Sequence, residues 1–453
     1  MKTILIIGAG LSASSLIRYF LENSTKNNWQ VRICDRDIDL VKSKINGLPN
    51  GTALSFNALD PDQRRPEIEK ADIVISMLPA RFHIDVAKDC IDLKTNLITP
   101  SYISPEMREL DQAAKDAGIV IMNEIGVDPG LDHMSAMKVI DEIQNKGGKL
   151  IGFESFTGGL IAPDSDNNPW NYKLTWNPRN VVLAGQGGAA KFIQEGKYKY
   201  IPYNRLFRRT EIIEIDGYGK FEGYANRNSL SYRETYGLEG IPTIYRGTLR
   251  RKGFSKAWNV FVQMGATDDS FTLENSKNMT KRDFINSFLP YHPTDSVELK
   301  LRYKMKIDQD DAIWDKLVWL GIFEDEGFDL DGDVTPAQYL QKIIEEKWVL
   351  DPEDKDMLVM WHKFNYILNG TEHEVTSHMI NIGEDQVYTS MSNTVGLPAA
   401  ICGKMILNNV IKAKGVTLPT NENVYLPILK ELDEYGISFI EKETAIDAKK
   451  RMI

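Results

Sequence analysis

The chain has 453 residues, more than one ordinary hydrophobic core organises, so two or three domains with a cleft between them are expected. Its hydrophobic fraction of 42% and charged fraction of 26% are typical of a folded globular protein and argue against disorder, collagen and coiled coil. The net charge of −10 disfavours nucleic acid and anionic membrane surfaces as partners.

The number and spacing of the cysteines and the length of the apolar runs argue against further classes of protein. Cys34, Cys90 and Cys402 form no CxxC pair, so we expect neither a disulfide scaffold nor a metal site. Cys34 falls in an apolar run and is interpreted as a buried residue. No apolar stretch is long enough to cross a membrane, and the first residues run straight into a glycine-rich turn. A cytoplasmic protein without a signal peptide is therefore expected.

Short apolar runs alternate with helical patterns in the first part of the chain. Helices are predicted after the first strand, over 82–92 and over 104–118, where Ser104 is the N-cap and Pro105 stands in the first turn. Strands are predicted at TILII (3–7), WQVRICD (29–35), ADIVISMLP (71–79) and TNLITP (95–100). Alternating strands and helices indicate an α/β fold with a doubly wound parallel sheet.

The pattern changes from about residue 149. Aromatic or alternating runs predict strands of a mixed sheet at LIGFESFTGGL (150–160), YKLTW (172–176), TEIIEI (210–215) and TIYRGTLR (243–250). Residues 297–365 are predicted to be helices with acidic loops, of which EDEGFDLDGDV (324–334) is one. Near the C-terminus, a helix opened by Gly396 and Pro398 and a last helix over 426–436 are expected.

The sharpest motif is the GxGxxA turn formed by Gly8, Gly10 and Ala13. It follows the first strand directly and opens a helix. Glycines allow a tight turn and let a pyrophosphate approach the free N–H groups of the helix N-terminus. In this context the motif predicts a dinucleotide-binding Rossmann domain.

Two neighbouring residues bear on which coenzyme binds. Asp35 ends the second predicted strand, where a carboxylate accepts hydrogen bonds from the adenosine ribose and repels a 2′-phosphate. This favours NAD. Arg36 follows directly and could pair with a 2′-phosphate, so NADP stays an alternative, and Asp35 could also be an ordinary turn residue.

Further strand ends are expected at the same crevice, because ligands bind outside the carboxyl ends of parallel strands. They are the segments 76–79, 99–102 and 123–128, and the first of these includes Met77 and Leu78. In the last of these, Asp128 could orient the coenzyme or bind a substrate ammonium, or it could form a turn before Pro129 and Gly130. His133 lies at the start of a predicted helix, and two roles stay open for it, a structural one and proton transfer.

Arginines in the second part of the chain are candidate substrate ligands. Arg227 lies in YANRNSL and Arg246 in YRGTLRRKG. A guanidinium binds carboxylates bidentately, as a substrate with several carboxylates would require, although an isolated arginine is more often a solvated surface charge.

Longer strings resemble a known family. They are PSYISPEMRELDQAAKDAGI, MNEIGVDPGLDHM, GGKLIGFESFTGGLIAP, YKLTWNPRNVV, ANRNSLSY, RGTLRRKGF, TVGLPAAICGKMIL and GVTLPTNENVYLPIL. In order and spacing they are similar to the glutamate-forming saccharopine dehydrogenases, also called saccharopine reductases, over nearly the whole chain. The resemblance implies an NAD(P)-dependent oxidoreductase that interconverts saccharopine with glutamate and 2-aminoadipate 6-semialdehyde in lysine metabolism.

The resemblance also implies domains and an assembly. A Rossmann domain over 1–130 would be completed by about 395–453, an α/β substrate-binding and dimerisation domain would cover 131–296 and 366–394, and a small helical domain would cover 297–365. A homodimer acting on a small amino-acid substrate is expected.

The resemblance implies coenzyme contacts at Gly10, Leu11, Ser12, Ala13, Asp35, Met77, Thr99 and its neighbour Ser101, Val127 and Trp176, and the motif and strand ends described above add Gly8, Arg36 and Leu78. Substrate contacts are expected at Ser101, Tyr102, Asp128, Arg227, Arg246, Gly247 and Thr248. Asp128, Tyr102 and His133 are the three candidates for proton transfer, and the sequence does not choose among them.

Two departures from the family pattern bear on the substrate. Thr157 and Ile161 stand where relatives often carry Cys and Pro, so a thiol is not required for acid–base chemistry. Two other functions stay open, namely an imine reductase for a polyamine or another amino-acid conjugate, and a non-catalytic dinucleotide sensor. A polyamine pocket would need acidic residues in place of Arg227 and Arg246, and the intact glycine turn disfavours a sensor that has lost turnover.

Overall fold

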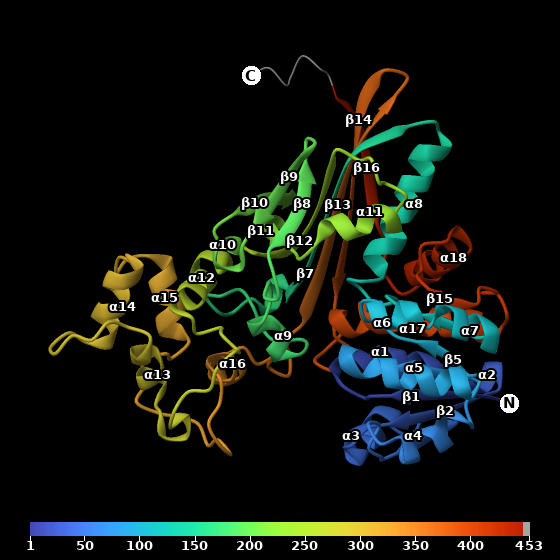
Figure 1. Cartoon of the computed structure of the whole chain (residues 1–453), viewed down its shortest axis with the longest axis horizontal. Helices are drawn as coiled ribbons and strands as arrows, with labels where there is room; N and C mark the ends of the chain where they lie inside the picture. The colour runs from blue at the N-terminus through green and yellow to red at the C-terminus, as the bar shows by residue number, and fades with distance from the viewer. Residues whose placement is uncertain (447–453) are drawn as a thin grey trace. The chain divides into compact units, whose positions relative to one another are not determined.

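The computed structural model describes residues 1–446 and forms two compact units. The first unit combines Met1–Leu150 with the chain from Met360 onward, and the second consists of Ile151–Val359. In Figure 1 the blue-to-cyan and the orange-to-red segments of the first unit pack together. The three-domain boundaries predicted from the sequence stay a prediction.

A parallel sheet forms the centre of the first unit. Its order is β15-β6-β5-β4-β1-β2-β3, and its pairings are parallel. The chain starts in the middle with β1, moves outward to β3 and returns to β4 on the other side of β1, which is the doubly wound order. The predicted fold class is confirmed. The strands are β1 (Lys2–Ile7), β2 (Trp29–Cys34), β3 (Gly51–Leu54), β4 (Ile73–Ser76), β5 (Asn96–Ile98), β6 (Val120–Met122) and β15 (Gly415–Thr417).

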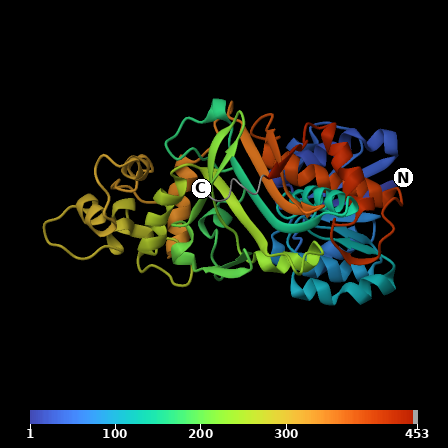
Figure 2. The ribbon, with the colours of Figure 1, turned by 90° about the horizontal axis from the view of Figure 1, so that it is seen from above.

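Helices cover this sheet. Leu5 and Ile7 of β1 pack in one apolar cluster with Val86 and Cys90 of α5, because alternate strand residues point to the same face. Figure 2 shows α1 and α17, drawn in blue and orange-red, in the same unit, where they contact each other. The helices are α1 (Ser14–Glu22), α2 (Ser24–Asn27), α3 (Ile38–Ile45), α4 (Pro61–Ile68), α5 (His83–Asp92), α6 (Pro105–Glu109), α7 (Asp111–Ala117), α8 (Leu131–Asn145), α17 (Ser390–Leu407) and α18 (Glu422–Asp433).

The predicted elements of the first unit are largely confirmed. Ser104 caps α6 by accepting a hydrogen bond from the backbone N–H of Met107. The single helix predicted over 104–118 is wrong in one respect, since it breaks at Leu110 into α6 and α7. The predicted start of the C-terminal helix is also wrong: α17 is capped by Thr389, and Pro398 lies inside it. β3 and β15 were not predicted, because a short strand of a few residues has no clear periodicity.

Strands dominate the first part of the second unit. β10, β11, β12 and β7 are adjacent in that order, and β8 pairs with β9 and β12. β12 runs parallel to β7 and antiparallel to β11. The elements are β7 (Lys149–Ile161), β8 (Ala190–Gln194), β9 (Lys197–Ile201), β10 (Thr210–Ile215), β11 (Gly219–Ala225), β12 (Thr243–Arg251), α9 (Pro178–Val182), α10 (Tyr203–Leu206), α11 (Tyr232–Thr235) and α12 (Phe254–Met264).

Helices form the rest of the second unit. Figure 1 shows them, in yellow and orange, grouped at one end of that unit. They are α13 (Lys281–Ser287), α14 (Val297–Met305), α15 (Ala312–Trp319) and α16 (Pro336–Lys347). The helical prediction for 297–365 is wrong at its end, because β13 (Asp356–Leu368) begins there and continues into the first unit. There β13 lies beside β14 (Thr371–Ile382), and β14 pairs with β16 (Ile440–Ile446).

One predicted strand is absent. The YKLTW run at 172–176 has no strand conformation. Its side chains serve tertiary contacts instead, since Tyr172 packs on Trp348 and Lys173 pairs with Asp354, while the backbone N–H of Leu174 donates to the carbonyl of Trp348. Tertiary packing therefore overrides the β-propensity of this run.

Candidate functional site

A cavity of about 390 Å³ opens at the carboxyl ends of β1, β2 and β4. Its wall includes Gly8 from the glycine turn, Asp35 and Arg36 after β2, and Leu78 and Arg81 after β4. The order of strands reverses between β1 and β4, and such a switch point is where doubly wound sheets bind ligands. Of the residues predicted to contact the coenzyme, Gly8, Asp35, Arg36 and Leu78 line this cavity, and their contact with a coenzyme stays a prediction.

The two glycines of the turn are required for different reasons. Gly8 has φ +104°, and a Cβ there would lie 3.1 Å from the carbonyl carbon and oxygen of Met77, so the fold itself demands glycine. Gly10 has an ordinary φ of −62°, and a Cβ there would meet nothing within 4 Å. Open space beside Gly10 is what a turn that receives a pyrophosphate needs.

Asp35 supports the glycine turn from the end of β2. One carboxylate oxygen accepts the backbone N–H of Ala9 at 2.8 Å, and the other accepts the N–H of Asp37 at 3.3 Å. The side chain therefore has a structural role in addition to any contact with a ribose. Arg36 and Arg81 are both exposed at the cavity wall, so positive charge is available there. Sequence reasoning missed Arg81, whose signal was its place five residues beyond the end of β4.

Cys34 also lines the cavity, and its predicted burial is confirmed. Burial raises the pKa of its thiol to about 12. The group therefore stays a neutral thiol at physiological pH.

His83 joins two strand ends at the same edge of the sheet. Its Nδ1 lies 2.9 Å from the hydroxyl of Ser76, at the end of β4, and its Nε2 lies 2.8 Å from the hydroxyl of Ser101, beyond β5. Burial lowers the pKa of the imidazole to about 4, so it is neutral at physiological pH. Sequence reasoning did not select this histidine, although it is the first residue of α5, the next α-helix after β4.

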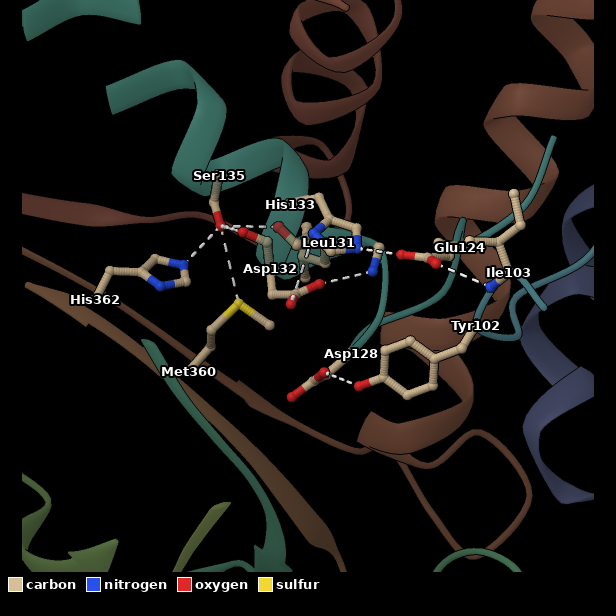
Figure 3. A network of polar contacts seen from close by, with 11 residues as sticks. Tyr102, Ile103, Glu124, Asp128, Leu131, Asp132, His133, Ser135, Met360 and His362 are labelled. Atoms are coloured by element: carbon tan, nitrogen blue, oxygen red, sulfur yellow. Dashed lines mark hydrogen bonds and ion pairs between the residues drawn. The ribbon is translucent and has the colours of Figure 1, made fainter. Parts of the chain in front are cut away.

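Tyr102 and Asp128 form a hydrogen-bonded pair beyond β5 and β6. The phenol of Tyr102 donates to Oδ1 of Asp128 at 2.8 Å, as Figure 3 shows. Both side chains are half-buried and so are not sealed in the core. The structure thus brings together two of the three predicted proton carriers.

The third predicted carrier, His133, lies deeper. It is fully buried on the first turn of α8, and its Nε2 is 2.7 Å from the carboxylate of Glu124. The other oxygen of Glu124 accepts the backbone N–H of Ile103 at 2.9 Å. In Figure 3 these contacts form a continuous network with Asp132.

A second buried histidine adjoins this network. Nε2 of His362 on β13 lies 2.8 Å from the hydroxyl of Ser135 on α8, and that hydroxyl also contacts the sulfur of Met360 (Figure 3). These contacts attach α8 to β13 within the first unit.

The predicted arginines are adjacent in the second unit. The backbone N–H of Asn226, which precedes Arg227, donates to the carbonyl of Arg246 at 2.9 Å. Arg246 is buried in β12, with its guanidinium 3.8 Å from the ring centroid of Tyr232, whereas Arg227 is exposed and has φ +46°. Gly247 follows Arg246, and a Cβ there would collide with the ring of Phe156.

The remaining predicted residues of this unit lie nearby in the fold. Thr248 continues β12 and pairs in register with Thr157 of β7. Thr157 is nearly buried, and among the described residues its hydroxyl has no hydrogen-bond partner. Ile161 is fully buried. Trp176 is half-buried in the loop before α9.

The residues predicted to contact coenzyme or substrate are therefore divided between the two units. In the first unit they follow the strand ends of one sheet edge, namely Gly8, Gly10, Leu11, Ser12, Ala13, Asp35, Arg36, Met77, Leu78, Thr99, Ser101, Tyr102, Val127 and Asp128, with His133 behind them. No group of three His, Cys, Asp or Glu side chains in residues 1–446 is arranged to hold a metal ion. Over the same residues, no helix has the length and apolar character of a membrane span.

Comparison with known proteins supplies the family. The model of the saccharopine dehydrogenase NADP binding domain matches residues 4–122, and that of the saccharopine dehydrogenase C-terminal domain matches residues 126–437. The chain belongs to the saccharopine dehydrogenase family. The resemblance inferred from the sequence motifs is confirmed, and so is the interpretation as an oxidoreductase.

Relatives match nearly the whole of this chain, and the fungal ones are themselves matched over nearly their whole length. Saccharopine dehydrogenase [NADP(+), L-glutamate-forming] of Saccharomyces cerevisiae is 35% identical, over 98% of this chain and 100% of that protein. The protein of the same name from Pyricularia oryzae is 34% identical, over 98% and 99%. The mitochondrial alpha-aminoadipic semialdehyde synthase of Rattus norvegicus is 32% identical over 98% of this chain, which spans 48% of that protein.

A solved structure agrees. Apo saccharopine dehydrogenase (L-Glu forming) from Saccharomyces cerevisiae superposes with a TM-score of 0.87 at 32% identity, covering 98% of this chain and 100% of that one. The family model and the names of these relatives specify NADP, and nothing in the comparisons supports NAD as the main coenzyme.

Proposed function

We propose that this chain is an NADP-dependent saccharopine dehydrogenase of the glutamate-forming type. It oxidises C6 of the six-carbon amino-acid skeleton, which is bonded to the secondary amine of saccharopine, by hydride transfer to NADP, and hydrolysis of the resulting imine then yields L-glutamate and 2-aminoadipate 6-semialdehyde. The observation that carries the proposal is the Tyr102–Asp128 pair, which lies at the carboxyl edge of the sheet that also forms the dinucleotide cavity. The relatives' names support the same reaction.

NADP is proposed over NAD because of the charges at the cavity. Arg36 and Arg81 supply two exposed guanidiniums there, and Asp35 already accepts two backbone N–H groups. A guanidinium forms charge-assisted, bidentate hydrogen bonds to a phosphate, so these arginines favour a 2′-phosphate. When bound, the coenzyme supplies the hydride acceptor, held at the turn of Gly8 to Ala13.

Proton transfer in this reaction is assigned to Tyr102 and Asp128. Loss of hydride requires a neutral amine, and hydrolysis requires a group that activates water, so a base must be within hydrogen-bond reach of the reacting centre. Asp128 accepts a hydrogen bond from the phenol of Tyr102, and this contact would let the pair pass a proton between substrate and solvent. Arg227, Arg246 and Thr248 are proposed to bind the substrate carboxylates, and Ser101 to contact coenzyme or substrate.

An initial-rate assay that follows the reduced coenzyme tests the reaction. Oxidation of saccharopine is expected with NADP at a kcat/KM at least about tenfold above that with NAD. The Arg36→Ala variant is expected to raise KM for NADP by roughly 10- to 100-fold, since a hydrogen bond to a charged group is removed, while NAD kinetics change by less than about threefold.

Arg208→Ala, at an exposed arginine outside the cavity, controls for the change in net charge. An equal preference for NAD would contradict the coenzyme assignment. Failure to oxidise saccharopine with either coenzyme would overturn the proposed activity.

We also propose a homodimer that works in the cytoplasm, on the basis of the family resemblance. Light scattering of the purified protein at working concentration tests the first point, and fractionation of cells tests the second. A monomer at that concentration would contradict the dimer.

A further inference from the structure

We infer that Glu124 and His133 are positioning residues that hold Tyr102 and Asp128 together for proton transfer. The inference rests on the proposed function, in which that pair is the acid–base group. It assigns His133, one of the three candidates for proton transfer, to a supporting role.

Glu124 links the two loops that carry the pair. It follows β6, is only 4% exposed and has φ +55°, which is unusual for a residue other than glycine. One carboxylate oxygen accepts the N–H of Ile103, whose peptide group joins it to Tyr102. The backbone N–H of Glu124 in turn donates to the carbonyl of Ser101 at 3.2 Å. Glu124 therefore holds the chain on both sides of Tyr102.

His133 continues the support to the loop of Asp128. Its Nε2 contacts the second oxygen of Glu124 at 2.7 Å, and its Nδ1 lies 3.9 Å from Asp132, as Figure 3 shows. Asp132 accepts the N–H of Gly130 at 2.7 Å, two residues after Asp128. The loop of Asp128 is thereby attached to the same network as the loop of Tyr102.

Burial separates the two roles. A proton carrier must come within about 2.6–3.2 Å of the reacting group, directly or through one water. His133 is 0% exposed, and its Nε2 already faces Glu124. Tyr102 and Asp128 are half-buried, so they remain the members of the network that can meet a substrate.

A double-mutant cycle tests Glu124. Glu124→Ala removes the acceptor of the Ile103 N–H and is expected to lower kcat by roughly 10- to 100-fold, as a misplaced catalytic group does, with KM for NADP changed by less than about twofold. Glu124→Gln retains an acceptor for Ile103 and offers an N–H to His133, so kcat is expected to recover to within about threefold of the native value.

In the Tyr102→Phe background, Glu124→Ala is expected to lower kcat by less than about threefold, because the hydroxyl it positions is gone. A purely structural role would give the same factor in both backgrounds, and that result would overturn the inference. A loss of kcat below about twofold for Glu124→Ala in the native background would overturn it as well.

A matched pair of variants at His133 tests the same inference if the Glu124→Ala variant does not fold. The amide nitrogen of Gln can take the place of Nε2, so His133→Gln is expected to keep the contact with Glu124, whereas the shorter His133→Asn loses it. His133→Asn should therefore show at least about tenfold lower kcat than His133→Gln. Equal kcat in the two variants would contradict the inference.

Tyr102→Phe and Asp128→Ala separate this inference from the proposed function. If both keep near-native kcat, the acid–base assignment is wrong. If both lose activity while the Glu124 and His133 variants do not, only the positioning role fails.

Discussion

His83 shows how a single side chain connects burial with pH dependence. A buried imidazole favours its neutral form, because burial removes the water that stabilises its charge. The pKa of His83 is lowered from the ordinary 6.5 to about 4. The unfolded chain takes up a proton near pH 6.5, and the folded protein does so only near pH 4, so His83 contributes full stability above pH 6.5 and loses it as the pH falls.

The difference in unfolding free energy between the native protein and the His83→Gln variant, here called the stability gap, is therefore expected to shrink on acidification. From pH 7 to pH 4 the native protein should lose roughly 3 kcal/mol more unfolding free energy than the variant, which carries no titratable group there. Urea unfolding followed by circular dichroism at several pH values measures the gap, and other groups cancel in the difference. A gap that is constant or grows on acidification would contradict the neutral, buried imidazole.

Individual residues differ in how far the sequence could predict them. Gly8 and Asp35 were found because their motif spacing is local. The contacts of the Asp35 side chain could not be predicted, because the N–H of Ala9 lies within reach of it only once β1 and β2 pair. His83 was missed for the same reason: Ser76 and Ser101 lie on different strand ends, and one sequence does not show that they meet.

At the scale of elements, the glycine turn separates what the fold requires from what the ligand requires. Gly8→Ala introduces a Cβ against the backbone of Met77 at a positive φ, so it is expected to destabilise the protein by about 2–4 kcal/mol. Gly10→Ala adds a Cβ in open space at an ordinary φ and is expected to change stability by less than about 1 kcal/mol. Its Cβ nonetheless stands where the pyrophosphate is proposed to approach, so the Kd for NADPH is expected to rise at least about tenfold.

Thermal melts and titration of coenzyme fluorescence measure the two effects on the same pair of proteins. Normal coenzyme affinity in Gly10→Ala would show that the turn does not hold the pyrophosphate. An unchanged melting temperature in Gly8→Ala would show that the close approach to Met77 is easily relieved.

Elements with a strong local pattern were predicted, and those that depend on distant partners were not. β1, β2, β4 and β5 were found from continuous apolar runs. The run at 172–176 has β-propensity, yet it packs against α16 and its loop through Trp348 and Asp354. β15 has three residues, and its conformation depends on sequence-distant partners, namely β6 and Asp111, which accepts the N–H of Val416.

At the scale of the whole molecule, the first unit is built from two chain segments that are more than two hundred residues apart. The backbone N–H of Ser15 donates to the hydroxyl of Ser392 at 2.9 Å, which joins the helix after the glycine turn to α17. Gly396 lies at the closest approach, where a Cβ would be 2.8 Å from the backbone nitrogen of Leu16. Such an approach cannot be seen in either segment alone. The family resemblance implies that C-terminal helices complete the Rossmann domain, and that division into domains stays a prediction.

Gly396→Ala is therefore expected to weaken coenzyme binding from a site that is remote in sequence from the glycine turn. The added methyl group must push α1 away from α17, which should cost about 1–3 kcal/mol of stability, and α1 follows the glycine turn that is proposed to receive the coenzyme. Gly240→Ala, where a Cβ meets nothing within 4 Å, is the control and should shift stability by less than about 0.5 kcal/mol. Thermal melts with and without NADPH test this: the Gly396 variant should melt lower and gain less from the coenzyme than the control, because a weaker Kd gives less stabilisation at equal ligand concentration. Equal gains in the two variants would mean that α17 does not help to hold the coenzyme-binding turn in place.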